Sequence, residues 1–222
     1  MSPKRTIEEF VTMLIVFEGI DGSGKSTQAA FAADWLRARF GERVLPTREP
    51  GGWDGGEALR ELILTGSLVA PWSEFFLFMA DRCEHVERVL RPALEAGKFV
   101  VCDRYSPSTM AYQLFGGGVG SEVRDYLLGL PDALALPKPD VVFWLDLEVA
   151  VAQRRLGMRG DANSFDVRGR DYFERVRAGY EAQMHMQASV AEGGGWIRVD
   201  ASGECDEISA GIASCLERLV TV

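Results

Sequence analysis

One short segment constrains the fold of this chain more than any other. Residues 19–26 read GIDGSGKS and match the phosphate-loop pattern G-x-x-x-x-G-K-[ST]. An apolar, β-rich run precedes the segment at residues 13–17, and residues 26–40 after it carry apolar side chains at helical spacing. A glycine-rich turn that merely joins a strand to a helix is the alternative, but a chance match is expected on the order of once in a hundred chains of this length. The pattern therefore predicts a strand, a phosphate-binding loop and a helix whose positive end faces the same anion.

Strand-like and helix-like segments alternate along the rest of the chain. Short apolar runs follow at residues 43–46, 99–102, 141–145 and 196–199, and stretches with helical periodicity separate them. This order predicts an α/β fold with a five-stranded parallel sheet and helices on both faces. A length of 222 residues suits a single domain, which we place at residues 12–222 after an N-terminal tail at residues 1–11.

Charge and composition limit the kinds of partner that the chain can bind and the compartment in which we expect it. The net charge of −9 opposes general binding to nucleic acid or to an anionic membrane, and no apolar run approaches the length that crosses a bilayer. Four cysteines without a CxxC pair favour a reducing compartment. We expect a cytoplasmic protein that binds a small nucleotide.

Polar and charged groups follow the predicted strands at their carboxyl ends, where ligands bind in open parallel sheets. These groups lie at residues 18–27, 47–52, 103–105 and 146. Lys25 is expected to reach the β- and γ-phosphates of a nucleotide, and the Ser26 hydroxyl is expected to bind Mg²⁺. The loop alone does not distinguish kinases from nucleotide-dependent switches, but the N-K-x-D motif of guanine-binding switches is absent from the sequence.

Three motifs in this order and spacing resemble the thymidylate kinase family: the phosphate loop, TREPGG at residues 47–52 and DRY at residues 103–105. The resemblance covers about residues 14–180 and includes AYQ at residues 111–113. It implies a P-loop nucleoside monophosphate kinase fold, Mg²⁺-dependent phosphorylation of dTMP to dTDP with ATP in dTTP synthesis, and a homodimer joined through helices. The alternatives are a kinase for another nucleoside monophosphate or a deoxynucleoside and, less favoured, a P-loop switch.

The resemblance implies a set of residues on the ATP side of the site. Lys25, Arg104 and Arg159 are the predicted catalytic residues, and Ser26 and Asp103 are the predicted metal ligands. The predicted ATP-binding residues are Gly19, Ile20, Asp21, Gly22, Ser23, Gly24, Lys25, Ser26, Thr27 and Arg155.

The predicted pyrimidine site lies on a helix that begins near Pro71, whose spacing places Phe75, Phe78 and Arg82 on one face. A guanidinium among aromatic side chains needs a partner, and either a pyrimidine carbonyl or an acidic neighbour can supply it. The resemblance favours the first, since it implies that Phe78 and Arg82 hold thymine.

Six further residues complete the predicted dTMP site. The resemblance implies that Arg48 and Arg104 bind the phosphate, that Asp21 and Tyr112 lie near the sugar, and that Ser108 and Thr109 face the pyrimidine. Each arginine has a surface ion pair as its alternative. A helix N-cap at Ser106 or Ser108 is the alternative for the hydroxyls.

The last predicted element is a lid at about residues 154–170. In the family the catalytic arginine comes from the phosphate loop or from the lid, and Gly22 occupies the loop position here. Arg159 is therefore the predicted lid arginine. Relatives of the lid type commonly carry Asp-Arg where this chain has Asn163-Ser164, and local pairing, such as Asp171 with Arg175, is the alternative role for the other arginines of this region.

Overall fold

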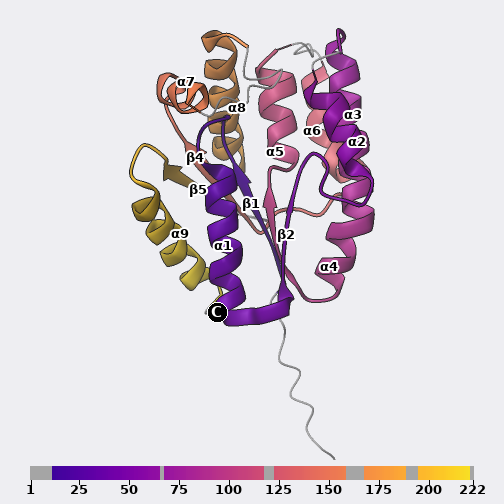
Figure 1. The fold of residues 1–222 in the computed structure, drawn as a ribbon. Coiled ribbons are helices and arrows are strands. Elements are labelled where there is room, and N and C mark those ends of the chain that lie inside the picture. The colour runs from indigo at the N-terminus through magenta and orange to yellow at the C-terminus, as the bar shows by residue number, and fades with distance from the viewer. Residues whose placement is uncertain (1–11, 66–67, 118–122, 159–167, 189–194, 221–222) are drawn as a thin grey trace, which may run out of the picture.

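A computed structural model describes residues 12–65, 68–117, 123–158, 168–188 and 195–220 of the chain. Within them a parallel sheet of five strands has the order β2-β3-β1-β4-β5 (Figure 1). The strands are β1 (Met13–Glu18), β2 (Val44–Arg48), β3 (Phe99–Asp103), β4 (Val141–Asp146) and β5 (Gly195–Asp200). The predicted five-stranded parallel architecture is confirmed.

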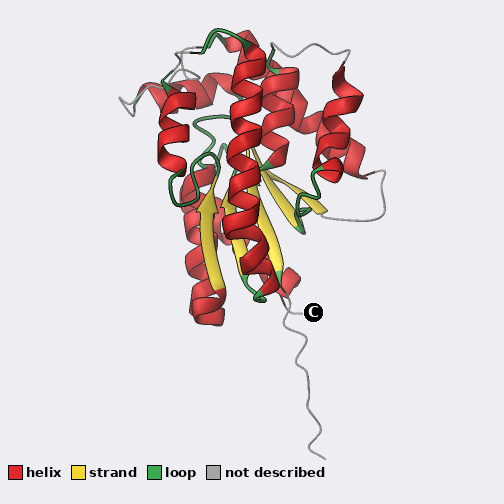
Figure 2. Ribbon diagram, turned by 90° about the vertical axis from the view of Figure 1, so that its right-hand side faces the viewer, coloured by secondary structure: helices red, strands yellow, loops and turns green. Residues whose placement is uncertain are grey.

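Helices connect the strands and enclose the sheet, as Figure 2 shows in red around the yellow strands. Their bounds are α1 (Lys25–Phe40), α2 (Gly56–Leu64), α3 (Pro71–His85), α4 (Arg91–Glu95), α5 (Ser106–Thr109), α6 (Arg124–Ala133), α7 (Val149–Gly157), α8 (Arg170–Ala188) and α9 (Cys205–Val220). A 3₁₀ turn, η1 (Gly41–Arg43), follows α1, and π-helical segments continue two helices as η2 (Val86–Leu90) and η3 (Met110–Phe115).

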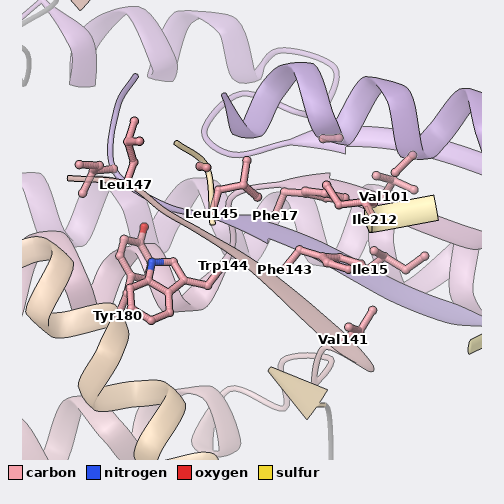
Figure 3. Close-up of a cluster of buried hydrophobic side chains, with 14 of the residues drawn as sticks. Ile15, Phe17, Val101, Val141, Phe143, Trp144, Leu145, Leu147, Tyr180 and Ile212 are labelled. Carbon is pink, nitrogen blue, oxygen red and sulfur yellow. The ribbon is translucent and has the colours of Figure 1, made fainter. Parts of the chain in front are cut away.

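The central strand β1 is buried on both faces, as a parallel sheet between helices requires. Ile15 and Phe17 point into a cluster with Leu36 of α1 and Ile212 of α9, whereas Leu14 and Val16 pack with residues of η2 and α4 on the opposite face. In Figure 3 Phe17 lies beside Phe143, and Trp144 lies against Tyr180 of α8. Side chains that alternate along each strand thus supply both halves of the core.

The strands extend further toward their carboxyl ends than the sequence predicted. Glu18, Arg48, Asp103 and Asp146 were expected in turns but are the last residues of β1 to β4. The ladder continues through them, since Arg48 pairs with Asp103 and Asp146 with Asp200. Apolar runs underestimate strand length here because backbone pairing continues where the side chains become polar. The sheet therefore delivers these side chains from rigid strands.

The predicted tail, residues 1–11, lies outside the described residues, and one domain over residues 12–222 stays a prediction. In the part of the chain that the structure describes, no helix combines the length and apolar character that crossing a membrane takes.

Candidate active site

A cleft of about 650 Å³ opens at the carboxyl ends of the central strands. It is lined by residues from the three predicted segments, with Asp21, Lys25 and Ser26 from the phosphate loop and α1, Arg48 from β2, and Asp103 and Arg104 from β3 and the turn after it. Because β2, β3 and β1 are neighbours in the sheet, segments more than 70 residues apart in the chain meet at one edge. The strand order thus explains why the three motifs form one site.

The phosphate loop leads directly into α1, whose N-terminal amides have no capping side chain. Gly24 is the N-cap residue in a left-handed conformation, with φ of 90°. Free amides at a helix N-terminus favour an anion. Among the other predicted loop residues, Ile20 is buried, its carbonyl accepting a hydrogen bond from the amide of Ser23, and Thr27 is exposed on the first turn of α1.

Gly22 has no room for a side chain. Its φ is 84°, and a Cβ atom there would lie 2.6 Å from the carbonyl oxygen of Ala152 in α7. Both the backbone conformation and the contact exclude an arginine at this position. Position 22 therefore cannot supply an arginine to the cleft.

Lys25 lies at the base of the cleft and contacts the loop itself. Its Nζ donates to the Ile20 carbonyl at 3.5 Å and to Asp21 Oδ1 at 3.2 Å. Burial and the nearby Arg104 charge lower the pKa of Lys25, against the opposing effect of Asp21 and Asp103. Burial opposes the ionisation of Asp21, but the charges of Arg104 and Lys25 outweigh it and hold the pKa of this carboxyl below its usual range. The loop therefore contains an ionised carboxylate held between two cations.

Ser26 and Asp103 meet across 77 residues of chain. Ser26 Oγ donates to Asp103 Oδ2 at 2.5 Å. The other oxygen, Asp103 Oδ1, is buried and has no hydrogen-bond partner among the described residues. A hydroxyl and a carboxylate oxygen without a donor fit a hard cation such as Mg²⁺, which takes few protein ligands and completes its shell with phosphate oxygens and water.

Arg104 joins the phosphate loop to the helices that follow β3. Its φ of 70° lies in the left-handed region, which non-glycine residues seldom adopt. Its guanidinium donates to Asp21 at 2.5 Å, to the Gly19 carbonyl at 3.2 Å and to Tyr112 Oη at 3.1 Å. Tyr112 Oη also donates to Asp21 Oδ2 at 3.0 Å. The structure thus brings Asp21, Arg104 and Tyr112 into one cluster.

Two arginines line the cleft beside Arg104. Arg48 Nη2 contacts Glu57 at 3.0 Å, and both side chains are at least half exposed. A surface ion pair of this kind contributes little to the free energy of unfolding. Arg60 of α2 also lines the cleft, and its Nη1 donates to the Pro50 carbonyl at 3.0 Å. Arg60 was not predicted as a site residue, because α2 carries no motif and only the tertiary structure brings Arg60 to the cleft.

Arg82 has its partner within the protein, as the alternative for this residue required. Its side chain is 2% exposed and forms an ion pair with Glu49 at 2.8 Å. It also donates to Thr109 Oγ1 at 2.7 Å and to the Tyr105 carbonyl at 3.0 Å. A pyrimidine carbonyl is therefore not needed to pair the Arg82 guanidinium, and the predicted contact of Arg82 with thymine stays a prediction. Glu49 directly precedes Pro50, 33 residues before Arg82, and helical spacing could not reveal it.

A smaller cavity of about 100 Å³ adjoins the cleft on the side of α3. Phe78, Thr109, Tyr112 and Gln113 line it, together with Asp21 and Arg104, which also line the larger cleft. The aromatic ring and the polar groups of this cavity therefore lie next to the phosphate side of the site. Gln113 belongs to the AYQ motif but was not predicted as a site residue.

Ser108 also lines the smaller cavity, and its hydroxyl binds a buried carboxylate. Its Oγ donates to Glu18 Oε2 at 2.6 Å, and Glu18 Oε1 accepts the amides of Tyr105 at 2.8 Å and Ser108 at 3.2 Å. Tyr105, not a serine, is the N-cap of α5, so the predicted N-cap at Ser106 or Ser108 is wrong. Burial raises the pKa of Glu18, although Arg104 and these donors oppose the rise. The carboxylate of Glu18, the last residue of β1, thus accepts the amides at the start of α5 that a capping serine would have accepted.

The structure describes residues 154–158 and 168–170 of the predicted lid. Arg159 lies outside the described residues. Arg155 of α7 donates to the Ala201 carbonyl at 3.0 Å and does not line the cleft. Arg175 donates to the Gly116 carbonyl at 2.7 Å, which overturns its predicted pairing with Asp171.

Three features together define a P-loop nucleoside monophosphate kinase: the strand order, the phosphate loop in the cleft, and the smaller cavity that adjoins this cleft. The profile of the thymidylate kinase family matches residues 17–212. Thymidylate kinases from Desulfovibrio desulfuricans (46% identity, covering 77% of this chain and 81% of the relative) and Synechococcus sp. strain JA-3-3Ab (40% identity, 92% and 95%) are similar to the chain. The crystal structure of thymidylate kinase from Ehrlichia chaffeensis aligns with a TM-score of 0.72 and 29% identity, covering 93% of this chain and 99% of the other.

The chain belongs to the thymidylate kinase family. Its reaction is the phosphorylation of dTMP to dTDP with ATP, a step of nucleotide biosynthesis. The predictions of fold, enzyme class and reaction are confirmed. The alternatives, a kinase for another nucleoside monophosphate or for a deoxynucleoside and a P-loop switch, are not favoured.

Proposed function

We propose that the cleft carries out this reaction by in-line transfer of the γ-phosphoryl group of Mg·ATP to a phosphate oxygen of dTMP. The observation that supports it most directly is that Lys25 of the phosphate loop, Arg48 of TREPGG and Arg104 of DRY line one cleft. The acceptor is already an anion, so no strong general base is required. Catalysis then depends on placing the two substrates in line and on neutralising the negative charge of their phosphates.

The donor would bind on the phosphate loop. Residues 19–26 would hold its phosphates through backbone amides, with Lys25 against the β- and γ-phosphates. Ser26 and Asp103 would hold Mg²⁺ directly or through its water. When bound, the metal ion neutralises phosphate charge and orients the phosphates. The partnerless Asp103 Oδ1 supports this assignment.

The acceptor would bind across the smaller cavity. Arg48 and Arg104 would contact the dTMP phosphate, and the sugar would lie beside Asp21 and Tyr112. Arg104 is already bound to Asp21, so its guanidinium is held in place before the phosphate arrives.

The base would stack on Phe78, with Thr109 and Arg82 at its edge. In this arrangement Glu49 orients Arg82 from one side, and a thymine carbonyl would add to contacts that Arg82 already has. Ser108 would act indirectly, through its hydrogen bonds to Glu18 and Arg104. The predicted direct contact between Ser108 and the pyrimidine stays a prediction.

The transferring phosphoryl group would be flanked by Lys25, Arg104 and Arg159. Gly22 leaves no room for a loop arginine, which supports a lid residue in this role. Arg155 stays a predicted ATP contact. Cytoplasmic location likewise stays a prediction.

A homodimer would bury an apolar face of α2 and α3. Leu62 of α2 and Trp72 and Phe76 of α3 are large apolar side chains that are 37% to 61% exposed. Trp72 and Phe76 stack on each other with ring centroids 5.9 Å apart. Neighbouring exposed aromatic residues of this kind are enriched at interfaces between subunits.

Lys25→Ala tests the proposed site most simply. Turnover should fall by roughly two orders of magnitude or more, because the phosphoryl group loses its principal cation. Lys138→Ala is the matched control, since Lys138 forms an exposed ion pair with Asp132 away from the cleft. ADP release in a coupled assay measures both. Near-normal turnover of folded Lys25→Ala would refute the assignment.

The lid assignment is tested by Arg159→Ala against Arg37→Ala, which alters an exposed pair with Asp34 on α1. The first should lower kcat at least tenfold with little change in the KM for dTMP. An unchanged kcat would exclude Arg159 as the catalytic arginine.

A further inference from the structure

Glu74 connects three parts of the chain at the edge of the smaller cavity. It lies on α3 one turn before Phe78 and its side chain is 14% exposed. Its Oε1 accepts a hydrogen bond from Gln113 Nε2 at 2.9 Å, and its Oε2 accepts one from Arg168 Nη2 at 2.5 Å. None of the motifs in the sequence includes Glu74.

The contact with Glu74 determines which end of the Gln113 amide faces the cavity. An ionised carboxylate only accepts hydrogen bonds, so the nitrogen of the amide must face Glu74 and the oxygen must point elsewhere. Gln113 is 3% exposed and lines the cavity beside Phe78 and Thr109. Among the described residues its side chain has no other hydrogen bond, so Oε1 is available as an acceptor.

An acceptor in this position distinguishes pyrimidines by the atom at N3. Thymine carries an N–H there, whereas cytosine carries a lone pair that repels an acceptor. A glutamine free to rotate presents either its oxygen or its nitrogen and so accommodates both bases. Fixing the amide turns an adaptable side chain into a selective one.

We propose that Glu74 is a positioning residue that holds the carbonyl of Gln113 toward the base and thereby favours dTMP over dCMP. This inference rests on the proposed placement of the base against Phe78. Arg168 supports the arrangement, because it binds the second oxygen of Glu74 and also donates to Tyr172 Oη at 2.7 Å. Glu74 is therefore held at both of its oxygens, and its carboxylate is fixed with respect to Gln113.

Glu74→Gln tests the role of the carboxylate. An amide at position 74 can either donate or accept, so Gln113 is free to turn its nitrogen toward the base. The ratio of kcat/KM for dTMP to kcat/KM for dCMP should fall roughly tenfold or more, and the KM for ATP should stay within about twofold. Glu84→Gln is the matched control on the same helix, because Glu84 forms only an exposed pair with Arg88. An unchanged ratio in folded Glu74→Gln would overturn the proposal.

The exchanged pair Glu74→Gln/Gln113→Glu gives a second test that does not depend on the single variant folding. Here the carboxylate stands at position 113 and can only accept, so the dTMP preference should return to within about threefold of the parent. A double variant that prefers dCMP would also overturn the inference. If the parent chain itself does not phosphorylate dTMP, the proposed site fails instead, which separates the two outcomes.

Discussion

Replacing Arg82 by methionine should destabilise the protein strongly, because Arg82 and Glu49 form a buried ion pair. Their side chains are 2% and 3% exposed, and the pair is 2.8 Å apart. Arg82→Met keeps most of the side-chain volume but leaves the Glu49 charge buried beside His85 alone. Breaking a buried pair in this way costs about 3–5 kcal/mol of unfolding free energy.

The assay is a double-mutant cycle of Arg82→Met, Glu49→Gln and both together, with urea unfolding for the free energies and thermal unfolding for the melting temperatures. Arg82→Met should lower the melting temperature by roughly 6–20 °C, at about 2–4 °C per kcal/mol for a chain of this size. The double variant should be more stable than the sum of the single effects predicts, by about 1–3 kcal/mol, because it removes both charges. A loss below about 1 kcal/mol for Arg82→Met would refute the reasoning from burial.

The same variant tests whether Arg82 also holds thymine. Under the proposed placement the KM for dTMP should rise at least tenfold while the KM for ATP changes little, since Arg82 lies at the acceptor side. Equal effects on both constants would indicate that Arg82 acts on the fold alone. The measurement is made well below the melting temperature of the variant, so that loss of folded protein does not enter either constant.

Three further perturbations have defined outcomes. Asp103→Asn should raise the Mg²⁺ concentration that gives half-maximal rate by roughly tenfold, and an unchanged Mg²⁺ dependence would exclude Asp103 from the metal site. Burial opposes ionisation of Asp146, but Arg177 and Arg198 outweigh it and hold its pKa below the usual range. The ionised Asp146 thus stabilises the folded protein above about pH 4, and this contribution is lost as the pH falls through the lowered pKa of the folded state. Asp146→Asn should therefore flatten the decline of the unfolding free energy below about pH 4. A decline as steep as that of the parent protein would contradict this. Phe76→Asp should convert a dimer into monomers in sedimentation analysis, and an unchanged mass would place the interface elsewhere.

The fold was predictable because its signals are local. Apolar runs of four or five residues identify the strands, and the phosphate-loop pattern fixes the first strand, loop and helix without knowledge of the rest of the chain. The strand order β2-β3-β1-β4-β5 is not local, and it was not predicted from the sequence. The ends of the strands were placed too early, because the prediction ended each strand at its first polar side chains. Backbone hydrogen bonding between strands continues past them.

The candidate site was predictable where a motif carried it and not elsewhere. Arg104 and Lys25 were identified from short patterns, and the structure brings both to the cleft. Glu18, Arg60 and Glu74 were missed, because only the tertiary structure brings Arg60 to the cleft and brings Glu18 and Glu74 to their hydrogen-bond partners. The signal for Glu18 was available in principle, since a carboxylate at the end of an otherwise apolar strand is unusual and requires buried donors.

One measurement tests the central claim that a single cleft transfers phosphate from ATP to dTMP. The purified chain is incubated with Mg·ATP and, in turn, with dTMP, dCMP, dAMP and dGMP, and the diphosphate formed is quantified. We expect rapid formation of dTDP with one ADP released per dTDP, and much slower formation of the other diphosphates. ATP hydrolysis without formation of dTDP, or a faster reaction with another monophosphate, would contradict it.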